Sequence, residues 1–118
     1  MTRPSRSSPA LLAALALCAI APAAGQAATY TGCKAVRDPY PRTRYAGVDL
    51  TRIRELHTTC TTARRVARRA HRKALRSTPP VSGVRRFTWN GWRVTGDLRP
   101  RHDRYVARKG ERRVRWRF

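Results

Sequence analysis

The stretch "CTTARRVARRAHRKAL", Cys60 to Leu75, decides the fold class of this chain. At 100° per residue, its small and apolar side chains fall on one face of a helix and its cationic side chains on the opposite face. The apolar face holds Cys60, Ala63, Val66, Ala67, Ala70 and Ala74, and the cationic face holds Arg65, Arg68, Arg69, Arg72, Lys73 and Arg76. The pattern predicts an amphipathic helix whose apolar face packs on a second layer of the protein.

The residues on either side of this stretch define the ends of the predicted helix. Thr58 and Thr59 supply an N-cap hydroxyl, which accepts a hydrogen bond from the first helical turn. Downstream, the sequence "STPPVSG" contains two prolines, which lack the backbone N–H that a helix needs. We therefore expect the helix to end near Arg76, with cations in its last turn at the negative end of the helix dipole.

From Phe87 onward, aromatic and β-branched residues alternate with turn residues. The Asn90-Gly91 pair in "FTWNGWRV" is a two-residue hairpin signal. The segment "RYVARKGERRVRWRF" predicts two more strands, joined across Lys109-Gly110. We therefore expect an antiparallel sheet in this part of the chain.

The last of these strands separates its side chains into two kinds. One face carries Val114, Trp116 and Phe118, and the other face carries Arg113, Arg115 and Arg117. If Tyr105 and Ala107 are to share the apolar face, the connection between the two strands must hold an even number of loop residues. A slip of one residue would turn the partner strand over.

Two segments precede the helix. The sequence "VDLTRIREL", Val48 to Leu56, is short and rich in aliphatic and β-branched residues, which favours a strand. Leu50, Ile53 and Leu56 also fit a helical spacing, so a helix is the alternative there. Residues 28–46 show no periodicity, and we expect them to be mostly irregular. Taken together, the segments predict an α+β fold in which one amphipathic helix packs on a small antiparallel sheet.

Residues 1–27 have the pattern of a secretory signal peptide. Two arginines precede the apolar run 10–21, and small residues follow it up to a cleavage position near Ala27. The run is shorter than the ~20 apolar residues that a membrane-spanning helix needs. We therefore expect a secreted protein whose mature part, residues 28–118, is a single small basic domain without a transmembrane segment.

Two cysteines, Cys33 and Cys60, remain in the expected mature part. A domain of this size has a small core and is often stabilised by a cross-link. In an exported chain, two cysteines indicate a single disulfide, and a reactive or metal-binding thiol pair is the alternative.

The charge of the chain points to anionic partners. The chain has 27 basic and six acidic residues; without the two arginines of the signal peptide, 25 and six remain, a formal charge of +19. This charge exceeds what solubility requires of a small domain. The strands downstream are expected to place Arg93, Arg104 and Arg108 on the same sheet face as the arginines of the last strand. The candidate binding residues are Arg65, Arg68, Arg69, Arg72, Arg76, Arg113, Arg115 and Arg117.

These observations favour a non-catalytic module that adsorbs to extracellular anionic polymers, such as nucleic acid, teichoic acid or acidic glycan, or to an anionic cell surface. Salt screening offers a simpler interpretation, in which both cationic faces are only solvated. A protein-binding or inhibitor-type disulfide scaffold is the alternative function. We expect the protein to be a monomer.

The residues for catalysis are few. Glu55 and His57 would point to the same side of a strand and form an acid–base pair, as small secreted ribonucleases use. A surface ion pair is the simpler interpretation. The sequence shows no Gly-rich phosphate loop, nucleophile motif or zinc-ligand spacing, so no metal or cofactor is expected.

Four aromatic side chains have alternative roles. Trp89, Trp92 and Trp116 can stack nucleic-acid bases, as in single-strand binders, or anchor the core, and we favour the core. His71 lies near the apolar edge of the predicted helix, where a packing role is expected.

The motifs "TxCxxAxxVA" at the helix start, "GW.V" and "Y.A..G...V.W.F" together resemble a group of small secreted cysteine-containing proteins of high-GC Gram-positive bacteria, a group without an assigned function. Its members typically carry four cysteines. This chain keeps two of them as Cys33 and Cys60 and has Val94 and Ala107 at the other two positions. The resemblance implies that the two missing cysteines bridge each other, which leaves Cys33 paired with Cys60. It implies no catalytic residues.

Overall fold

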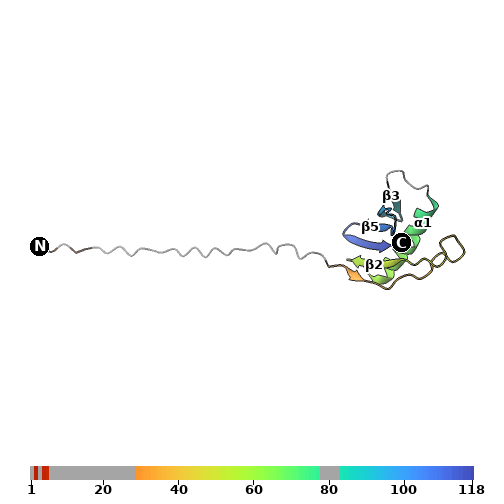
Figure 1. The fold of residues 1–118 in the computed structure, drawn as a ribbon. Coiled ribbons are helices and arrows are strands. Elements are labelled where there is room, and N and C mark those ends of the chain that lie inside the picture. The colour runs from red at the N-terminus through yellow and green to blue at the C-terminus, as the bar shows by residue number, and fades with distance from the viewer. Residues whose placement is uncertain (1, 3, 6–28, 78–82) are drawn as a thin grey trace.

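The computed structural model describes residues 2, 4–5, 29–77 and 83–118 (Figure 1). The predicted signal peptide and its cleavage position lie almost wholly outside the described residues, as do the two prolines expected to stop the helix. The elements are β1 (Thr31–Gly32), β2 (Thr51–Leu56), α1 (Cys60–Arg76), β3 (Val84–Trp89), β4 (Trp92–Asp97), β5 (Arg104–Lys109) and β6 (Arg112–Arg117). One helix packs on a six-stranded antiparallel sheet, which confirms the predicted α+β fold.

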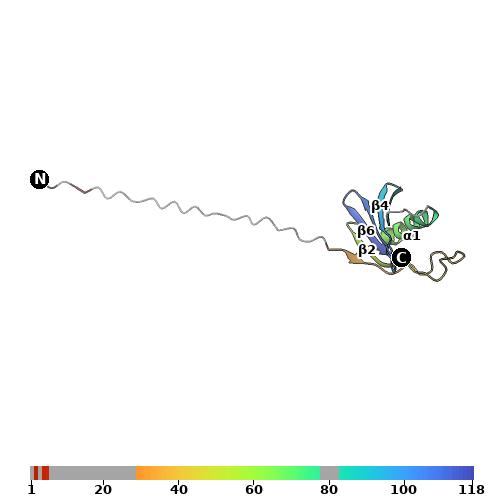
Figure 2. The same ribbon diagram turned by 45° about the horizontal axis from the view of Figure 1, so that its top comes forward.

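The strands lie in the order β1-β2-β6-β5-β4-β3. Strands β3 to β6 follow one another as a meander, whereas β2 pairs with the last strand, β6. Helix α1 connects β2 with β3 at the far edge of the sheet and packs against one face, which we call the inner face (Figure 2). The opposite, outer face of the sheet is left without a covering layer in the part of the chain that the structure describes.

The first predicted hairpin is confirmed between β3 and β4. Asn90 and Gly91 both have positive φ angles, 45° and 78°, as the mirror-image turn of a two-residue hairpin requires. Trp89 and Trp92 are paired across this turn.

The connection between β5 and β6 also has two residues, so the even number expected from the sequence is confirmed. Tyr105 therefore lies opposite Trp116, and Ala107 lies opposite Val114. All four side chains are buried on the inner face.

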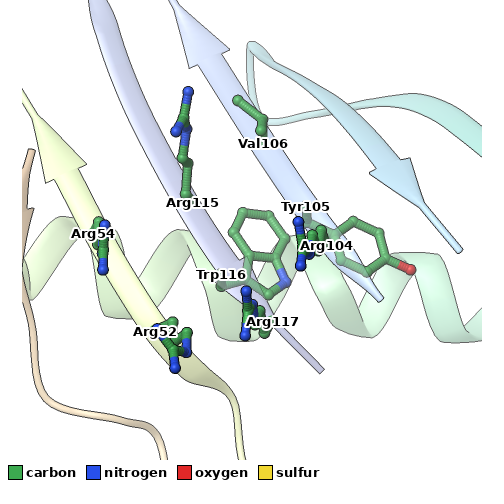
Figure 3. Close-up of a pocket in the computed structure, with 8 residues that line it drawn as sticks. All are labelled: Arg52, Arg54, Arg104, Tyr105, Val106, Arg115, Trp116 and Arg117. Carbon is green, nitrogen blue, oxygen red and sulfur yellow. The ribbon is translucent and has the colours of Figure 1, made fainter. Parts of the chain in front are cut away.

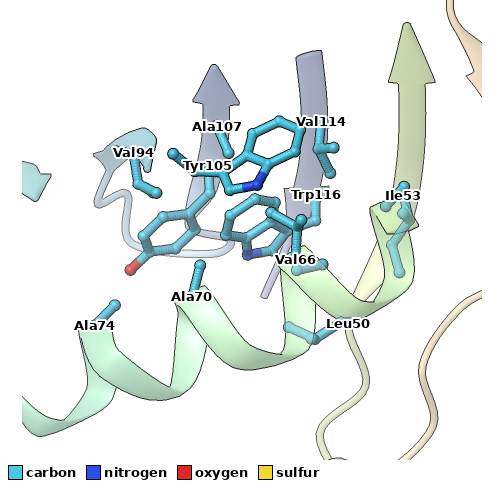
Figure 4. Close-up of a cluster of buried hydrophobic side chains, with 13 residues drawn as sticks. Leu50, Ile53, Val66, Ala70, Ala74, Val94, Tyr105, Ala107, Val114 and Trp116 are labelled. Carbon is cyan, nitrogen blue, oxygen red and sulfur yellow. The ribbon is translucent and has the colours of Figure 1, made fainter. Parts of the chain in front are cut away.

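Helix α1 forms where the sequence predicts it. The side chain of Thr59 caps its start by accepting a hydrogen bond from the backbone N–H of Thr62 at 3.1 Å, and the helix ends at Arg76. Its buried residues pack against side chains of the inner face, as Figure 4 shows. The helix side of this core consists of Ala63, Val66, Ala67, Ala70 and Ala74, and the sheet side of Ile53, Trp92, Val94, Tyr105, Ala107, Val114 and Trp116.

His71 completes the core at the C-terminal half of α1, and its predicted packing role is confirmed. It is fully buried, its Nδ1 lies 3.0 Å from the hydroxyl of Tyr40, and its ring centroid lies 4.1 Å from that of Phe118. Tyr40 donates its hydroxyl proton to the carbonyl oxygen of Arg68 at 3.1 Å. Burial, and to a lesser degree the charge of Arg85, lowers the pKa of His71 to about 3, so the imidazole is neutral at physiological pH.

The Cys33–Cys60 disulfide is present, with a Cα–Cα distance of 5.4 Å. It joins the segment after β1 to the first residue of α1 across a sequence separation of 27 residues. By the chain-entropy relation, closing such a loop stabilises the fold by about 3–4 kcal/mol.

Strand β2 confirms the strand interpretation of the segment before the helix, and it contains a bulge. Its register with β6 shifts between Thr51 and Arg54, and Arg52 adopts a left-handed conformation with φ 48°. Ile53 is buried in the core, while the exposed Arg52 and Arg54 on either side of it line the same hollow of the surface. Before β2, the described chain has only β1, a bridge between Val36 and Leu50, and turns.

Candidate anion-binding surface

The outer face of the sheet gathers arginines because strand alternation turns them away from the core. The register places them directly opposite one another on neighbouring strands, which lie ~4.8 Å apart. Four such pairs are formed by Arg54 and Arg115, Arg104 and Arg117, Arg108 and Arg113, and Arg93 and Arg108. Like charges directly opposite one another destabilise a sheet. The outer face therefore carries an arrangement that stability alone does not favour.

Four of these side chains, together with Arg52, surround a hollow of about 350 Å³ (Figure 3). They are Arg52, Arg54, Arg104, Arg115 and Arg117, and we call them the sheet arginines. Figure 3 shows them on the side of the strands that faces away from α1. The pKa of Arg117 is lowered, by desolvation first and then by the charges of Arg104, Arg52 and Arg54. The hollow is thus a site of concentrated positive potential.

Acidic side chains do not neutralise this surface. In residues 29–77 and 83–118, the single ion pair joins Arg99 Nε to Asp97 Oδ2 at 2.8 Å. Asp97 lies opposite Arg104, but its carboxylate is engaged by Arg99. Other carboxylates accept hydrogen bonds from backbone N–H groups, namely those of Asp38, Asp49, Glu55 and Asp103. Most of the acidic residues therefore hold loops in place.

Aromatic groups are nearly absent from the outer face. The three tryptophans all belong to the inner face, where Trp92 and Trp116 are buried and Trp89 is half-buried against the core. Tyr30 is the exception, because the guanidinium of Arg115 lies 4.4 Å from its ring centroid. A ligand on this face meets guanidinium groups rather than stacking platforms.

A second group of arginines lies on the exposed side of α1, away from the sheet. We call Arg65, Arg68, Arg69, Arg72 and Arg76 the helix arginines; all five are exposed. Arg65, Arg68 and Arg69 line a hollow of about 230 Å³ together with Arg64.

Lys73, which the helical periodicity places with the helix arginines, turns instead to the edge of the sheet. Its ammonium donates to the carbonyl of Thr88 and lies 5.8 Å from the ring centroid of Phe87.

The predicted binding residues thus fall into separate groups. Arg115 and Arg117 join the hollow of the sheet arginines, whereas Arg113 is half-buried and donates to the carbonyl of Gly110 at 3.2 Å. Arg52 and Arg54 were missed by the sequence interpretation. Their place beside Arg115 and Arg117 depends on the pairing of β2 with β6, which has no local sequence signal.

The candidate catalytic pair does not have the expected geometry. Strand β2 ends at Leu56, and His57 follows in a left-handed conformation with φ 56°, so the expectation that Glu55 and His57 share one strand face is wrong. The carboxylate of Glu55 accepts the backbone N–H of Thr58 at 3.0 Å and holds the turn before α1. In the described structure, no hydrogen bond joins the two candidate side chains.

Two further observations concern metals and membranes. Within the described ranges, no three His, Cys, Asp or Glu side chains form a group able to hold a metal ion. The helix of the described chain is too short and too polar to cross a bilayer.

Compared with known proteins, the chain matches no family model, no curated protein and no solved structure. The fold and the surface define a class of protein in structural terms only. That class is a small α+β domain with one disulfide and two arginine-rich faces.

Proposed function

We propose that the protein is a secreted, non-catalytic module that binds extracellular anionic polymers through the outer face of its sheet. The observation that carries the proposal is the set of four directly opposed arginine pairs. Each pair costs the free protein a few tenths of a kcal/mol or more. A bound polyanion removes this repulsion and replaces it with charge-assisted hydrogen bonds.

The chemistry of the sheet arginines fits a chain of phosphates, carboxylates or sulfates. A guanidinium presents planar, paired donors that bind such groups in a bidentate manner. Because the tryptophans belong to the inner face, binding relies on charge rather than on base stacking. Nucleic acid, teichoic acid and acidic glycans share the required chemistry, and the affinity for each should fall steeply with salt.

The test compares two variants of equal charge. The first is the sheet variant, Arg104→Gln, Arg115→Gln and Arg117→Gln. The matched control variant, Arg37→Gln, Arg42→Gln and Arg101→Gln, removes three exposed arginines that belong to neither arginine group. Binding of fluorescent oligothymidylate, poly(glycerol phosphate) and heparin is measured by anisotropy over a series of salt concentrations.

We expect the sheet variant to bind at least tenfold more weakly at 100 mM salt. If three phosphate contacts are lost, the slope of log K against log salt should fall by roughly 2–3 units. The control variant should lose much less. Equal losses in both variants would show that net charge, not the sheet face, governs binding.

Other outcomes would favour the alternative functions. One tight protein partner whose affinity barely changes with salt would support a protein-binding scaffold and contradict the proposal. Turnover of labelled RNA that is lost in His57→Ala would establish a ribonuclease-like enzyme and contradict the non-catalytic assignment.

A further inference from the structure

We infer that the helix arginines form a second polyanion site, separate from the sheet arginines, and that the protein bridges two polymer segments, one on each face. The inference rests on the proposed function, because it requires that the sheet face binds an anionic polymer. It adds a function that a single binding face does not have, namely cross-linking of anionic chains.

The two arginine groups lie on opposite sides of the domain. Helix α1 packs on the inner face of the sheet through Ala63, Ala67, Ala70 and Ala74, which are fully buried. The helix arginines therefore point away from the sheet. The sheet arginines point away from the helix, as Figure 3 shows.

The distance between the groups keeps them electrostatically independent. A helix with its side chains is ~10–12 Å across, and the sheet and the arginine side chains on both sides add to this thickness. The Debye length is only ~8 Å at 0.15 M salt. The charge of one face is therefore largely screened at the other, and each face attracts its own segment of polymer.

The interior between the two faces is closed to a polymer chain. Buried side chains fill the space between α1 and the sheet, with Trp116, Tyr105 and Val66 at its centre (Figure 4). A chain bound to the sheet face must go around the domain to reach the helix face. A short oligomer can therefore occupy one face only.

Each face is long enough to hold several anionic groups. On α1, the distance from Arg65 to Arg76 is eleven residues at 1.5 Å per residue, or ~16 Å. On β6, Arg113 to Arg117 covers ~13 Å at 3.3 Å per residue, and opposed arginines on the neighbouring strands widen the surface. Both faces match a polymer of closely spaced charges better than a single small anion.

The experiment uses oligothymidylate of six nucleotides, ~20 Å at 3.4 Å per nucleotide, which is long enough to cover one face and too short to go around the domain. One population of this oligomer is labelled with a donor dye and another with an acceptor dye. Energy transfer between the populations reports bridging, and the anisotropy of either one reports binding alone. Four proteins are compared: the wild type, the sheet variant, the control variant and a helix variant, Arg65→Gln, Arg68→Gln and Arg72→Gln. Circular dichroism establishes that each is folded.

We expect the wild type and the control variant to bind two oligomers per protein and to give energy transfer. The transfer should rise and then fall as protein is added, because excess protein leaves each oligomer on a different molecule. The sheet variant and the helix variant should each bind one oligomer per protein. Each should give much less energy transfer than the wild type.

The result separates the inference from the proposed function. A wild-type protein that binds one oligomer and gives no energy transfer would overturn bridging and leave the sheet-face proposal intact. If the sheet variant loses all binding and the helix variant binds as the wild type does, the helix arginines bind no oligomer. This result would likewise overturn the inference of a second site. No binding by the wild type would contradict both proposals. Energy transfer that persists in both variants, with a protein dimer seen by sedimentation, would also refute bridging through opposite faces.

Discussion

The buried His71 predicts how the stability of the domain changes with pH. Tyr40, Tyr105 and Phe118 surround its ring, and the charge of Arg85 acts on it from β3. Burial first, and this charge second, lower its pKa from 6.5 to about 3. The folded protein therefore keeps the imidazole neutral where the unfolded chain takes up a proton. Below pH 6.5, proton uptake favours the unfolded state, and the free energy of unfolding should fall.

The magnitude follows from the two pKa values. Each pH unit between them corresponds to ~1.4 kcal/mol, so going from pH 7.5 to pH 5 should cost about 2 kcal/mol of stability from this residue alone. The loss should continue until the folded protein is protonated, near pH 3. Asp103 acts in the opposite direction, because burial raises its pKa above the usual value of 3.8. The contribution of His71 is therefore measured as the difference between the wild type and a variant without the imidazole.

The assay is urea unfolding at pH 7.5, 6.5, 5.5 and 5.0, on the wild type and on His71→Gln, which has no ionisable group at this position. The wild type should lose about 2 kcal/mol more than the variant over this range. His71→Phe serves as the neutral reference if the glutamine variant does not fold. If wild type and variant lose stability in parallel, the folded imidazole titrates normally and the reasoning is refuted.

Two further predictions concern the sheet. Gly96→Ala should destabilise the fold by about 1–3 kcal/mol in urea unfolding, through overpacking. A Cβ at this position would lie 2.8 Å from Cδ1 of the buried Tyr105 ring and closer still to Cε1. Unchanged stability of the variant would mean that the Tyr105 ring is not held against Gly96. The double substitution Val94→Cys and Ala107→Cys should form a disulfide, because these residues are directly opposed on β4 and β5. Opposed residues of antiparallel strands have Cα atoms ~4.5–5.5 Å apart, which suits a disulfide. Mass spectrometry would detect the bond as a loss of two hydrogens. Two free thiols after oxidation would contradict this register.

Local patterns predicted the parts of the fold that depend on neighbouring residues. The helix was predictable because its alanine stripe repeats over 17 residues with a threonine at its N-cap. The hairpin at Asn90-Gly91 was predictable because few residue pairs accept two positive φ angles in succession. The start of β3 was missed, since Arg85 occupies an inward position that an apolar residue normally takes.

Long-range pairing accounts for what the sequence did not predict. Alternation along β6 placed Arg115 and Arg117 on the outer face, but nothing near them indicates which strand lies alongside. Arg54 becomes the neighbour of Arg115 only because β2 pairs with β6, and Arg52 lies at the bulge where the register of this pair shifts. An arginine whose backbone adopts the left-handed conformation cannot be recognised from the sequence, whereas a glycine often marks this conformation. The hollow of the sheet arginines is therefore a property of the folded sheet.

The pairing of β2 with β6 also has a consequence for the order of folding. During synthesis, β2 and α1 leave the ribosome long before their partner, since Thr51 pairs with Arg117. Contacts this distant in sequence form late and slow the folding reaction. The helix and its alanine stripe have no complete sheet to cover until the final strand arrives. The six-stranded sheet that covers the helix can therefore be complete only after almost the whole chain has been synthesised.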